Sequence, residues 1–475
     1  MSAMSAAAPM DPVGTARRKF LLPLALAQFI CSFAGSNMNV MINDISDDLD
    51  TDVQGVQLAI TSFLLIMAIL MIPCSKLTDR WGRKRCFTIG LVLYGIGALL
   101  SAAAPGLGIL ILGNSILEGV GTALLIPPVY ILTTLLLTDL TSRARAFGVI
   151  SAAGGVGGAS GPLIGGLITE AISWRAAFVF QALVIAAIIW LARRGVEDPL
   201  PADPTRPFDT GGAILSAVGL VLVVMGILAA DNNGWLMLAL FVAGALVLAW
   251  FFRSVRAKER AGQEPLLSTG LFRNRTSNLG LVTQNAQWLL LMGVSFVVAA
   301  YLQVVRGYDA IQTGVIFTAA TVGLLASSLG AERFAKRRPQ WALIVAGFVV
   351  TIAGIGVLLG MVVGNPSVWA FTPGLLLIGL GLGLMLTPSV NVVQSAFPEE
   401  RQGEISGLSR SVSNLGSSLG TAIAGTILVA GITATPERAY GLAMIVLAAV
   451  GLVGLVASAL LPRTPAPADA PAASP

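Results

Sequence analysis

The residue whose type and position point most directly to chemistry is Glu118, within the apolar stretch 107–130. It stands about 12 residues into that stretch, which is roughly 17 Å along an α-helix. We place no other acid deep inside an apolar stretch, because the rest occupy loops, tails or stretch ends. A carboxylate in hydrocarbon is unfavourable unless it is paired or protonated, so such a residue is a functional candidate by default.

Burial favours the neutral form of a carboxyl group. Glu118 is therefore expected to exchange a proton near neutral pH, or to trade it for a cationic ligand. Asn114, Ser115 and Thr122 lie within one helical turn of Glu118 and share its face, so we expect them to hydrogen-bond it. The alternative is a permanently protonated glutamate that holds its helix to a neighbour; we favour the functional interpretation.

Arg410 is a second charged residue within an apolar stretch, 405–430, but it stands only a turn or two from the beginning. We expect its long side chain to snorkel to the lipid headgroups. The alternative is a pair with Glu118, which needs the two helices to approach each other.

The elements that hold these residues follow from the composition. Of 475 residues, 55% are hydrophobic and 11% are charged, and the mean hydropathy is +0.84. Soluble proteins carry about 25% charged residues, so we predict an all-α integral membrane protein. There is no His, and the three cysteines have no zinc-type spacing. We therefore expect no metal, no cofactor and no disulfide framework.

A membrane-spanning helix needs about 20 apolar residues, and the chain contains fourteen such stretches. They centre on 20–42, 55–74, 86–104, 107–130, 146–169, 175–192, 211–230, 235–252, 278–303, 311–330, 340–363, 369–391, 405–430 and 439–461. With a cytoplasmic N-terminus, all 29 basic residues except Arg175, Arg306 and Arg438 lie on the inner side. The positive-inside rule therefore predicts that both termini are cytoplasmic, and the pI of 9.4 reflects topology rather than nucleic-acid binding.

An internal repeat divides the chain. Four glycines recur at a constant offset of 259 residues: Gly148, Gly157, Gly161 and Gly166 match Gly407, Gly416, Gly420 and Gly425. We predict a tail at 1–16, a six-helix half at 17–195, two inserted helices at 196–255, a second six-helix half at 256–462 and a tail at 463–475, with both tails disordered. Transporters built from such repeats bind substrate near the midplane, between the repeats.

Two motifs make the chain recognisable. The first is the loop 76–85, KLTDRWGRKR, with Asp79, Arg80, Gly82 and Arg83; the second is the run 157–166, GGASGPLIGG. Together they resemble motif A and motif C of the major facilitator superfamily, in its fourteen-helix drug:proton antiporter branch, over residues 17–462. The resemblance implies alternating-access export. The branch usually has an Asp in the first helix and a basic residue in the fourth; this chain has Ala34 or Gly35, and Ser115.

We expect the first motif to act as a latch, in which Asp79 caps a nearby helix and pairs with Arg83 or a neighbouring basic group. Topology determination by positive charge is the alternative. In the second motif, Gly157, Gly161 and Gly165 align on one face and permit close approach of another helix, beside Gly166. Pro162 removes a backbone donor and can bend the helix. The functional interpretation is a seam that limits leakage, and ordinary packing is the alternative.

Polar or aromatic groups on otherwise apolar helices are the candidates for a substrate cavity. Each is as readily explained as a hydrogen bond between helices. They are Asn37, Asn39, Asn114, Ser115, Gln284, Asn285, Gln287, Trp288 and Asn391.

The sequence thus predicts a monomeric exporter in the cytoplasmic membrane, not an enzyme. Its partners would be a small amphipathic, cationic substrate, protons and the bilayer, with no nucleic acid. The glycine-rich runs fit no nucleotide-binding pattern, which disfavours an ATP-driven pump. An exporter of lipids or endogenous metabolites, and a non-transporting sensor or structural subunit, stay open as alternatives. A sugar uptake carrier is disfavoured by the second motif.

Overall fold

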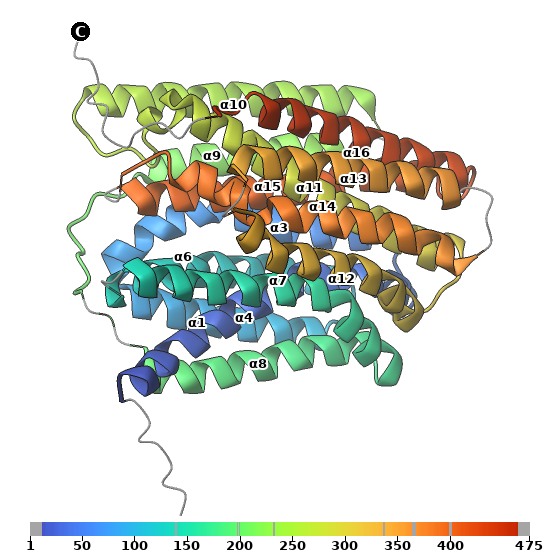
Figure 1. Cartoon of the computed structure of the whole chain (residues 1–475), viewed down its shortest axis with the longest axis horizontal. Coiled ribbons are helices and arrows are strands. Elements are labelled where there is room, and N and C mark those ends of the chain that lie inside the picture. The colour runs from blue at the N-terminus through green and yellow to red at the C-terminus, as the bar shows by residue number, and fades with distance from the viewer. Residues whose placement is uncertain are drawn as a thin grey trace, which may run out of the picture.

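A computed structural model describes residues 12–137, 140–196, 198, 200–230, 233–335, 338–362, 367–398 and 401–463. In these residues the protein is helical and has no strand, and fourteen helices are long and apolar enough to cross a membrane (Figure 1). This confirms the predicted fold class and span number. Twelve spans are α1 (Pro12–Asn37), α3 (Val53–Trp81), α4 (Arg83–Ala102), α7 (Leu140–Ala171), α8 (Trp174–Gly195), α9 (Thr210–Leu228), α10 (Gly234–Arg260), α12 (Ala310–Ala335), α13 (Gln340–Val362), α14 (Thr372–Gln394), α15 (Gln402–Gly431) and α16 (Pro436–Ala459).

The other two spans contain π-helical segments, in which hydrogen bonds skip one residue more than in an α-helix. One span combines α5 (Leu107–Leu110), the π-helix η2 (Ile111–Glu118) and α6 (Gly119–Leu136). The other combines α11 (Arg275–Ala300) with the π-helix η4 (Tyr301–Val305). The short elements are η1 (Met38–Val40), α2 (Ile42–Asp48), η3 (Thr269–Arg273) and η5 (Val368–Phe371).

The two six-helix halves repeat the same packing. The pair α1–α7 in the N-terminal half corresponds to α11–α15 in the C-terminal half, and α4–α6 corresponds to α13–α14. The halves meet through α3 against α15 and α7 against α12. The inserted α9 packs on α3 and α15, with Val224 buried against Leu65 and Ala422, and α10 packs on α9. Figure 1 shows α10 along one edge of the bundle.

Two boundaries differ from the expected ones. Helix α1 begins at Pro12, inside the segment 1–16 that we expected to be a tail, and α10 continues to Arg260, beyond residue 255. Residues 1–11 and 464–475 lie outside the described residues, so the predicted disorder of the tails stays a prediction. The last turns of α10, RSVRAKER, are charged, so they lie beyond the apolar stretch from which its end was predicted.

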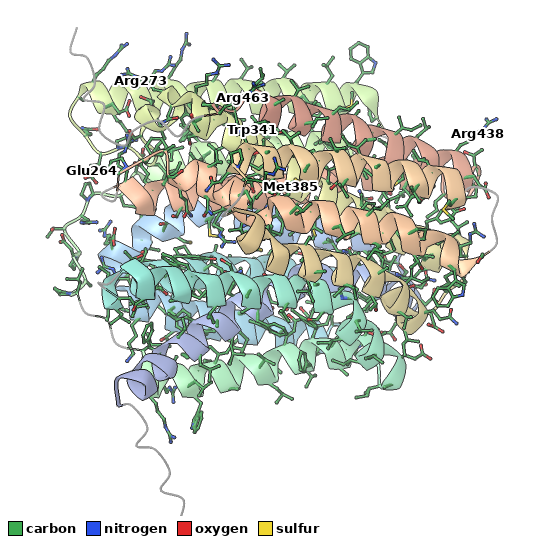
Figure 2. The ribbon with its side chains drawn as sticks, in the orientation of Figure 1. Glu264, Arg273, Trp341, Met385, Arg438 and Arg463 are labelled. Atoms are coloured by element: carbon green, nitrogen blue, oxygen red, sulfur yellow. The ribbon has the colours of Figure 1, made fainter. Side chains whose placement is uncertain are left out.

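The two ends of the bundle carry opposite charge. The α3–α4 turn holds Arg80, Arg83 and Lys84, and we call this side the basic end. The opposite side carries α2, with Asp44 and Asp47, and we call it the acidic end. Figure 2 places Arg463 near the basic end and Arg438 at the opposite end of the bundle.

Candidate functional site

Glu118 is the last residue of η2, and its side chain is fully buried. The amide of Asn114 lies 3.5 Å from Oε2, and Tyr94 and Ser101 of α4 also face the carboxyl group. A Cβ added to Gly97 of α4 would lie 2.9 Å from Cγ of Glu118. The carboxyl group therefore lies inside the N-terminal half, between η2 and α4.

Only one of the three expected hydrogen-bond partners of Glu118 faces it. The hydroxyl of Ser115 instead donates to the carbonyl of Ala59 at 2.8 Å, and Thr122 accepts from the thiol of Cys31 at 3.8 Å. For Ser115 the expectation assumed α-helical spacing, whereas the π-helical segment rotates successive side chains by a smaller angle; Thr122 lies beyond that segment, in α6.

The carboxyl group is incompletely satisfied. Oε1 of Glu118 and Oδ1 of Asn114 are buried without a hydrogen-bond partner among the residues that the structure describes. An unpaired buried oxygen is costly, and a proton on the carboxyl group would let it donate to an acceptor. Tyr94, which faces the same carboxyl group, donates at 2.5 Å to Oε1 of Gln181 in α8. Glu118 therefore belongs to a buried polar group that spans three helices of one half.

Arg410 does not snorkel to the basic end, which corrects our expectation. Its guanidinium donates to the hydroxyl of Tyr130 in α6 and lies 4.7 Å from the centre of that ring. The Tyr130 hydroxyl also donates to Oε1 of Gln28 in α1 at 3.2 Å, and its ring stacks on Phe147 of α7. The guanidinium here meets both a hydroxyl and a π face. Arg410 thus bridges the halves, without meeting Glu118.

A second bridge joins the halves at the acidic end and was missed from the sequence. Nε2 of Gln303, in η4, donates to the carbonyl of Asn39 at 2.7 Å. The backbone N–H of Asn43 donates to Oε1 of Gln303 at 3.2 Å, and the Asn43 amide donates to the Gln303 carbonyl at 2.8 Å. The π-helical geometry that presents Gln303 to η1 and α2 has no signal that we can read from sequence.

The glycines of the second motif form a close contact between helices, as their spacing predicts. A Cβ on Gly157 would collide with the carbonyl oxygen of Phe29, and one on Gly161 with Ser36, both in α1. Gly165 lies against Asn37 of α1, whereas Gly166 lies against Ala310 of α12. One face of the motif therefore packs α7 against α1, and the adjacent face packs α7 against α12 of the C-terminal half. Pro162 reaches α12 too, since a Cβ on Gly314 would lie 2.6 Å from its carbonyl oxygen.

The contact between α7 and α12 covers only part of α7. It runs from the acidic end to the hydrogen bond of 2.6 Å from Thr321 to the carbonyl of Ala159. Gly155 and Gly148 lie four and eleven residues before Ala159, so they are on the same face of α7, closer to the basic end. A Cβ on either glycine would meet nothing within 4 Å. The α7–α12 contact is thus present at the acidic end and absent at Gly155 and Gly148, whereas α3 and α15 stay in contact toward the basic end, where Ser411 donates to the carbonyl of Ala68.

The loop of the first motif forms an ionic cluster. Asp79 accepts from Arg83 at 2.6 Å and from Arg206, in the segment before α9, at 2.7 Å. Asp79 pairs with Arg83 as expected, but the helix cap that we assigned to it belongs to Asp198. Oδ2 of Asp198 accepts from the N–H groups of Arg83 and Lys84, at 2.7 and 3.2 Å.

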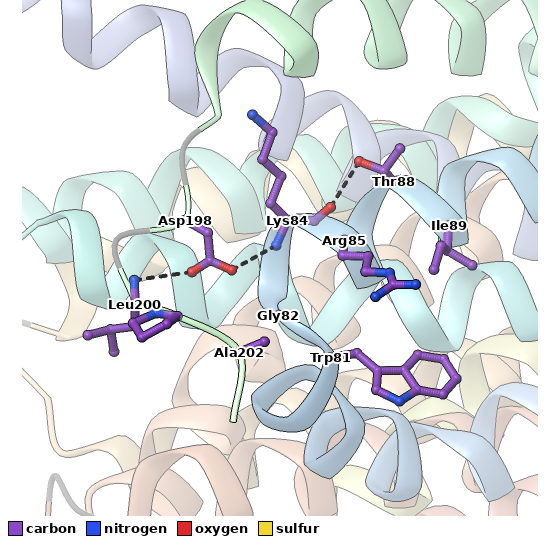
Figure 3. A pocket seen from close by; sticks show the side chains of 10 residues that line it. Trp81, Gly82, Lys84, Arg85, Thr88, Ile89, Asp198, Leu200 and Ala202 are labelled. Atoms are coloured by element: carbon purple, nitrogen blue, oxygen red, sulfur yellow. Dashed lines mark hydrogen bonds between the residues drawn. The ribbon is translucent and has the colours of Figure 1, made fainter. Parts of the chain in front are cut away.

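Figure 3 shows this loop from close by. Gly82 has φ +91°, a conformation that favours glycine, and it lets the chain turn between α3 and α4. Beside it lies an open pocket of about 580 Å³, lined among others by Trp81, Lys84 and Asp198. Arg80 is half-buried in the last turn of α3.

Most of the cavity candidates make hydrogen bonds within one half. Gln284 accepts from Ser409, Gln287 accepts from Ser389, and Asn285 donates to the carbonyl of Val412. These contacts match the alternative that we gave for them, which is packing between helices.

The remaining cavity candidates differ in exposure. Asn37 is fully buried, and neither of its amide atoms has a hydrogen-bond partner among the described residues. Asn39 is also buried, Trp288 is half-buried, and Asn391 of α14 is exposed. Their contact with a substrate stays a prediction.

Comparisons with known proteins agree with this architecture. The model of the Major Facilitator Superfamily matches residues 24–215 and 208–421. The chain is 30% identical to the puromycin resistance protein of Streptomyces alboniger, over 86% of this chain and 81% of that protein. It is 27% identical to the multidrug efflux pump LfrA of Mycolicibacterium smegmatis, over 78% and 72%, and 24% identical to the riboflavin transporter RibZ of Clostridioides difficile, over 85% and 86%.

A solved structure supports the fold. The crystal structure of a POT family transporter in complex with a thioalcohol-conjugated peptide superposes with a TM-score of 0.68 at 17% identity, covering 93% of this chain and 96% of that one. Together with the family match and the fourteen helices, these findings identify a membrane transporter rather than an enzyme. The chain belongs to the Major Facilitator Superfamily.

Proposed function

We propose that this transporter exports hydrophobic or amphipathic compounds from the cytoplasm in exchange for protons, by alternating access. Its relatives include proteins named for puromycin resistance and for multidrug efflux. The charge asymmetry of the loops supports a cytoplasmic basic end and both termini in the cytoplasm. The chain works as a monomer in this proposal, because each monomer contains both halves.

The observation that carries the proton coupling is the position of Glu118. Its carboxyl group is fully buried, and one oxygen has no partner. A buried carboxyl group without a cation is stable only when protonated, so deprotonation requires a rearrangement that admits water or a new donor. Because η2 is π-helical and such segments are less regular than α-helices, we assign that rearrangement to η2 and α4.

Glu118 acts on the substrate indirectly in this scheme. Its carboxyl group faces α4 within one half, rather than the surface between the halves where α7 and α12 separate. Proton binding therefore changes how α4 and η2 pack, and this packing sets the angle of the N-terminal half. The cationic substrate that the sequence suggested depended on direct contact with Glu118, and we no longer propose it.

The arrangement of the halves supports export. They are joined at the acidic end by Gln303, whereas a Cβ on Gly155 or Gly148 of α7, toward the basic end, would meet nothing within 4 Å. With the basic end in the cytoplasm, this arrangement would admit substrate from the cytoplasm, which is the loading step of an exporter.

The proposal can be tested in everted membrane vesicles that contain the protein. After energisation, a panel of amphipathic dyes should accumulate inside the vesicles, and collapse of the proton gradient with nigericin should release them. Vesicles without the protein are the control. If no dye accumulates but a fluorescent phospholipid or riboflavin does, the substrate is an endogenous lipid or metabolite. Failure of the whole panel, phospholipid and riboflavin included, would contradict transport by this chain.

A further inference from the structure

The surface where the two halves meet carries a cation without a carboxylate partner. Arg410 of α15 is half-buried, and no described Asp or Glu lies within 4 Å of its guanidinium. Its contacts are the hydroxyl and the ring of Tyr130. Removing a charge from water is costly unless an opposite charge compensates it, so this position favours the arrival of an anion.

The position lies within the membrane-spanning part of the bundle. Arg410 stands eight residues after the beginning of α15, which corresponds to about 12 Å of helix. Tyr130 stands six residues before the end of α6, or about 9 Å. The pair therefore lies about two helical turns inside both helices, measured from the basic end, and between the two halves.

The groups beside Arg410 suit an aromatic ligand that carries an acidic group. Tyr130 and Phe147 stack with ring centres 5.9 Å apart, and both aromatic side chains are partly exposed. Gln28, buried at the edge of this surface, holds the Tyr130 hydroxyl. Gly148, next to Phe147, borders open space. An aromatic body therefore has a surface to lie on, and a planar guanidinium to bind its acidic group.

Charge elsewhere in the site does not cancel that of Arg410. Glu118, the deep carboxyl group, faces α4 inside the N-terminal half. Asn391 of α14 is exposed and neutral. Gln394, one turn after it, donates to Ser406, which precedes Arg410 by one turn of α15. The described groups around the pair are thus cationic, neutral or aromatic, and a cationic ligand would be repelled there.

We propose that Arg410, Tyr130 and Gln28 form a substrate subsite for the carboxylate or phenolate of an aromatic amphipath. The guanidinium fork binds the two oxygens of a carboxylate in parallel, and in doing so exchanges the Tyr130 hydroxyl for a charged acceptor. Tyr130 then keeps its bond to Gln28 and stacks against the ligand. This assignment rests on the proposed export function, since it names the substrate class for that pathway.

The test uses two dyes that differ in one group: rhodamine B, which has a free carboxylate, and its ethyl ester, which lacks it. Binding to the purified full-length protein in nanodiscs is measured by fluorescence polarisation, without any gradient. Because a hydrogen bond to a charged group contributes about 1.5–3 kcal/mol, the acid should bind roughly ten- to hundredfold more tightly than the ester.

Three variants make the result specific. Arg410→Gln should remove the preference for the acid, and Arg410→Lys, which keeps the charge but not the fork, should retain part of it. Arg463→Gln is the matched control, because Arg463 also lies over an aromatic ring, Trp341, at 5.4 Å, but away from the halves' contact surface (Figure 2). It should behave like the wild type. Thermal unfolding verifies that each variant is folded.

Three results would overturn the subsite: equal or tighter binding of the ester, an acid preference that survives in Arg410→Gln, or no binding of either dye. The dye-accumulation assay in vesicles reports separately on export. Acid-selective binding without proton-driven accumulation would refute the proposed function and leave the subsite standing. If both dyes accumulate in the vesicles but bind with equal affinity in nanodiscs, the subsite is refuted and the proposed function stands.

Discussion

Gln303 of η4 and Asn43 of α2 are joined by two hydrogen bonds, both donated by Asn43, across the acidic end of the two halves. Nε2 of Gln303 also donates to the carbonyl of Asn39. One side chain from the C-terminal half thereby holds the segment that follows α1 in the N-terminal half. In an alternating-access cycle these bonds must break before the acidic end opens.

Gln303→Ala should shift the protein toward a state open at the acidic end. The substitution removes two bonds between the halves, each worth about 1 kcal/mol, so the open population should rise roughly tenfold or more. Spin labels at Ile172 and Glu437, one in each half, would report the distance distribution at this end. Gln312→Ala is the control, because the bonds that Gln312 makes to described residues join it to Asp309 within its own half. Identical distributions for both variants would rule out a role of Gln303 in closure.

Arg83→Ala should destabilise the protein more than Arg206→Ala, although both arginines pair with Asp79. The Arg83 side chain is 9% exposed and that of Arg206 is 55% exposed. We expect a loss of about 2 kcal/mol for Arg83 and less than about 1 kcal/mol for Arg206, whose pair is screened by solvent and salt. Denaturant unfolding in detergent measures both. Equal losses would mean that burial does not set the strength of this cluster.

Asp209 makes stability depend on pH. Burial by itself would raise the pKa of this carboxyl group, but the hydrogen bonds from Lys258, from Gly212 N–H and from Leu266 N–H outweigh it and lower the pKa below its ordinary value. A lowered folded-state pKa gives stability that is present above the unfolded-state pKa, near 3.9, and is lost as the pH falls through the folded-state value.

Asp209→Asn should therefore lower the unfolding temperature at neutral pH and have a smaller effect in acid. Asn is still a good N-cap for α9, so the loss reports on the charge and on its pair with Lys258. Unfolding temperatures of both proteins at about pH 7 and about pH 3.5 supply the comparison. A difference that stays constant with pH would show that the Asp209 charge does not stabilise the fold.

Gly157→Ala should be strongly destabilising, whereas Gly155→Ala should be tolerated. A Cβ on Gly157 collides with the Phe29 carbonyl of α1, a backbone atom that cannot rotate away, while a Cβ on Gly155 meets nothing within 4 Å. We expect a loss of about 1–3 kcal/mol or more for Gly157 and no loss for Gly155, since Ala favours helix. Unfolding temperature and yield of folded protein are the measurements. Equal tolerance at both positions would refute the close α1–α7 contact.

Much of the fold could be predicted because each membrane-spanning helix requires a long apolar stretch, which is visible in the sequence. Hydropathy located fourteen spans, and the regular spacing of Gly157, Gly161 and Gly165 located a close helix contact. These features depend on composition and on α-helical periodicity, which are local properties of the chain. The glycines that recur at a constant offset of 259 residues predicted the division into two six-helix halves.

The parts that could not be predicted depend on departures from that periodicity or on distant partners. Ser115 turned away from Glu118 because the segment between them is π-helical, and Thr122, in α6, bonds Cys31 of α1 instead; neither contact can be predicted from the residues alone. Arg410 contacts Tyr130, which lies 280 residues away in the sequence. The cap of α4 came from Asp198 rather than Asp79 for the same reason. Such pairings are decided by tertiary packing.

The central claim is that Glu118 carries the proton that drives export, and substrate-induced proton release from everted vesicles tests it most directly. Wild type, Glu118→Gln and Glu437→Gln are compared between about pH 6 and 8.5; Glu437 is exposed in the first turn of α16 and undergoes the same chemical change. We predict proton release that depends on substrate in the wild type and in Glu437→Gln, and none in Glu118→Gln, with all three proteins equally folded. Proton release by Glu118→Gln at the wild-type rate would contradict the account and leave Glu118 a structural residue.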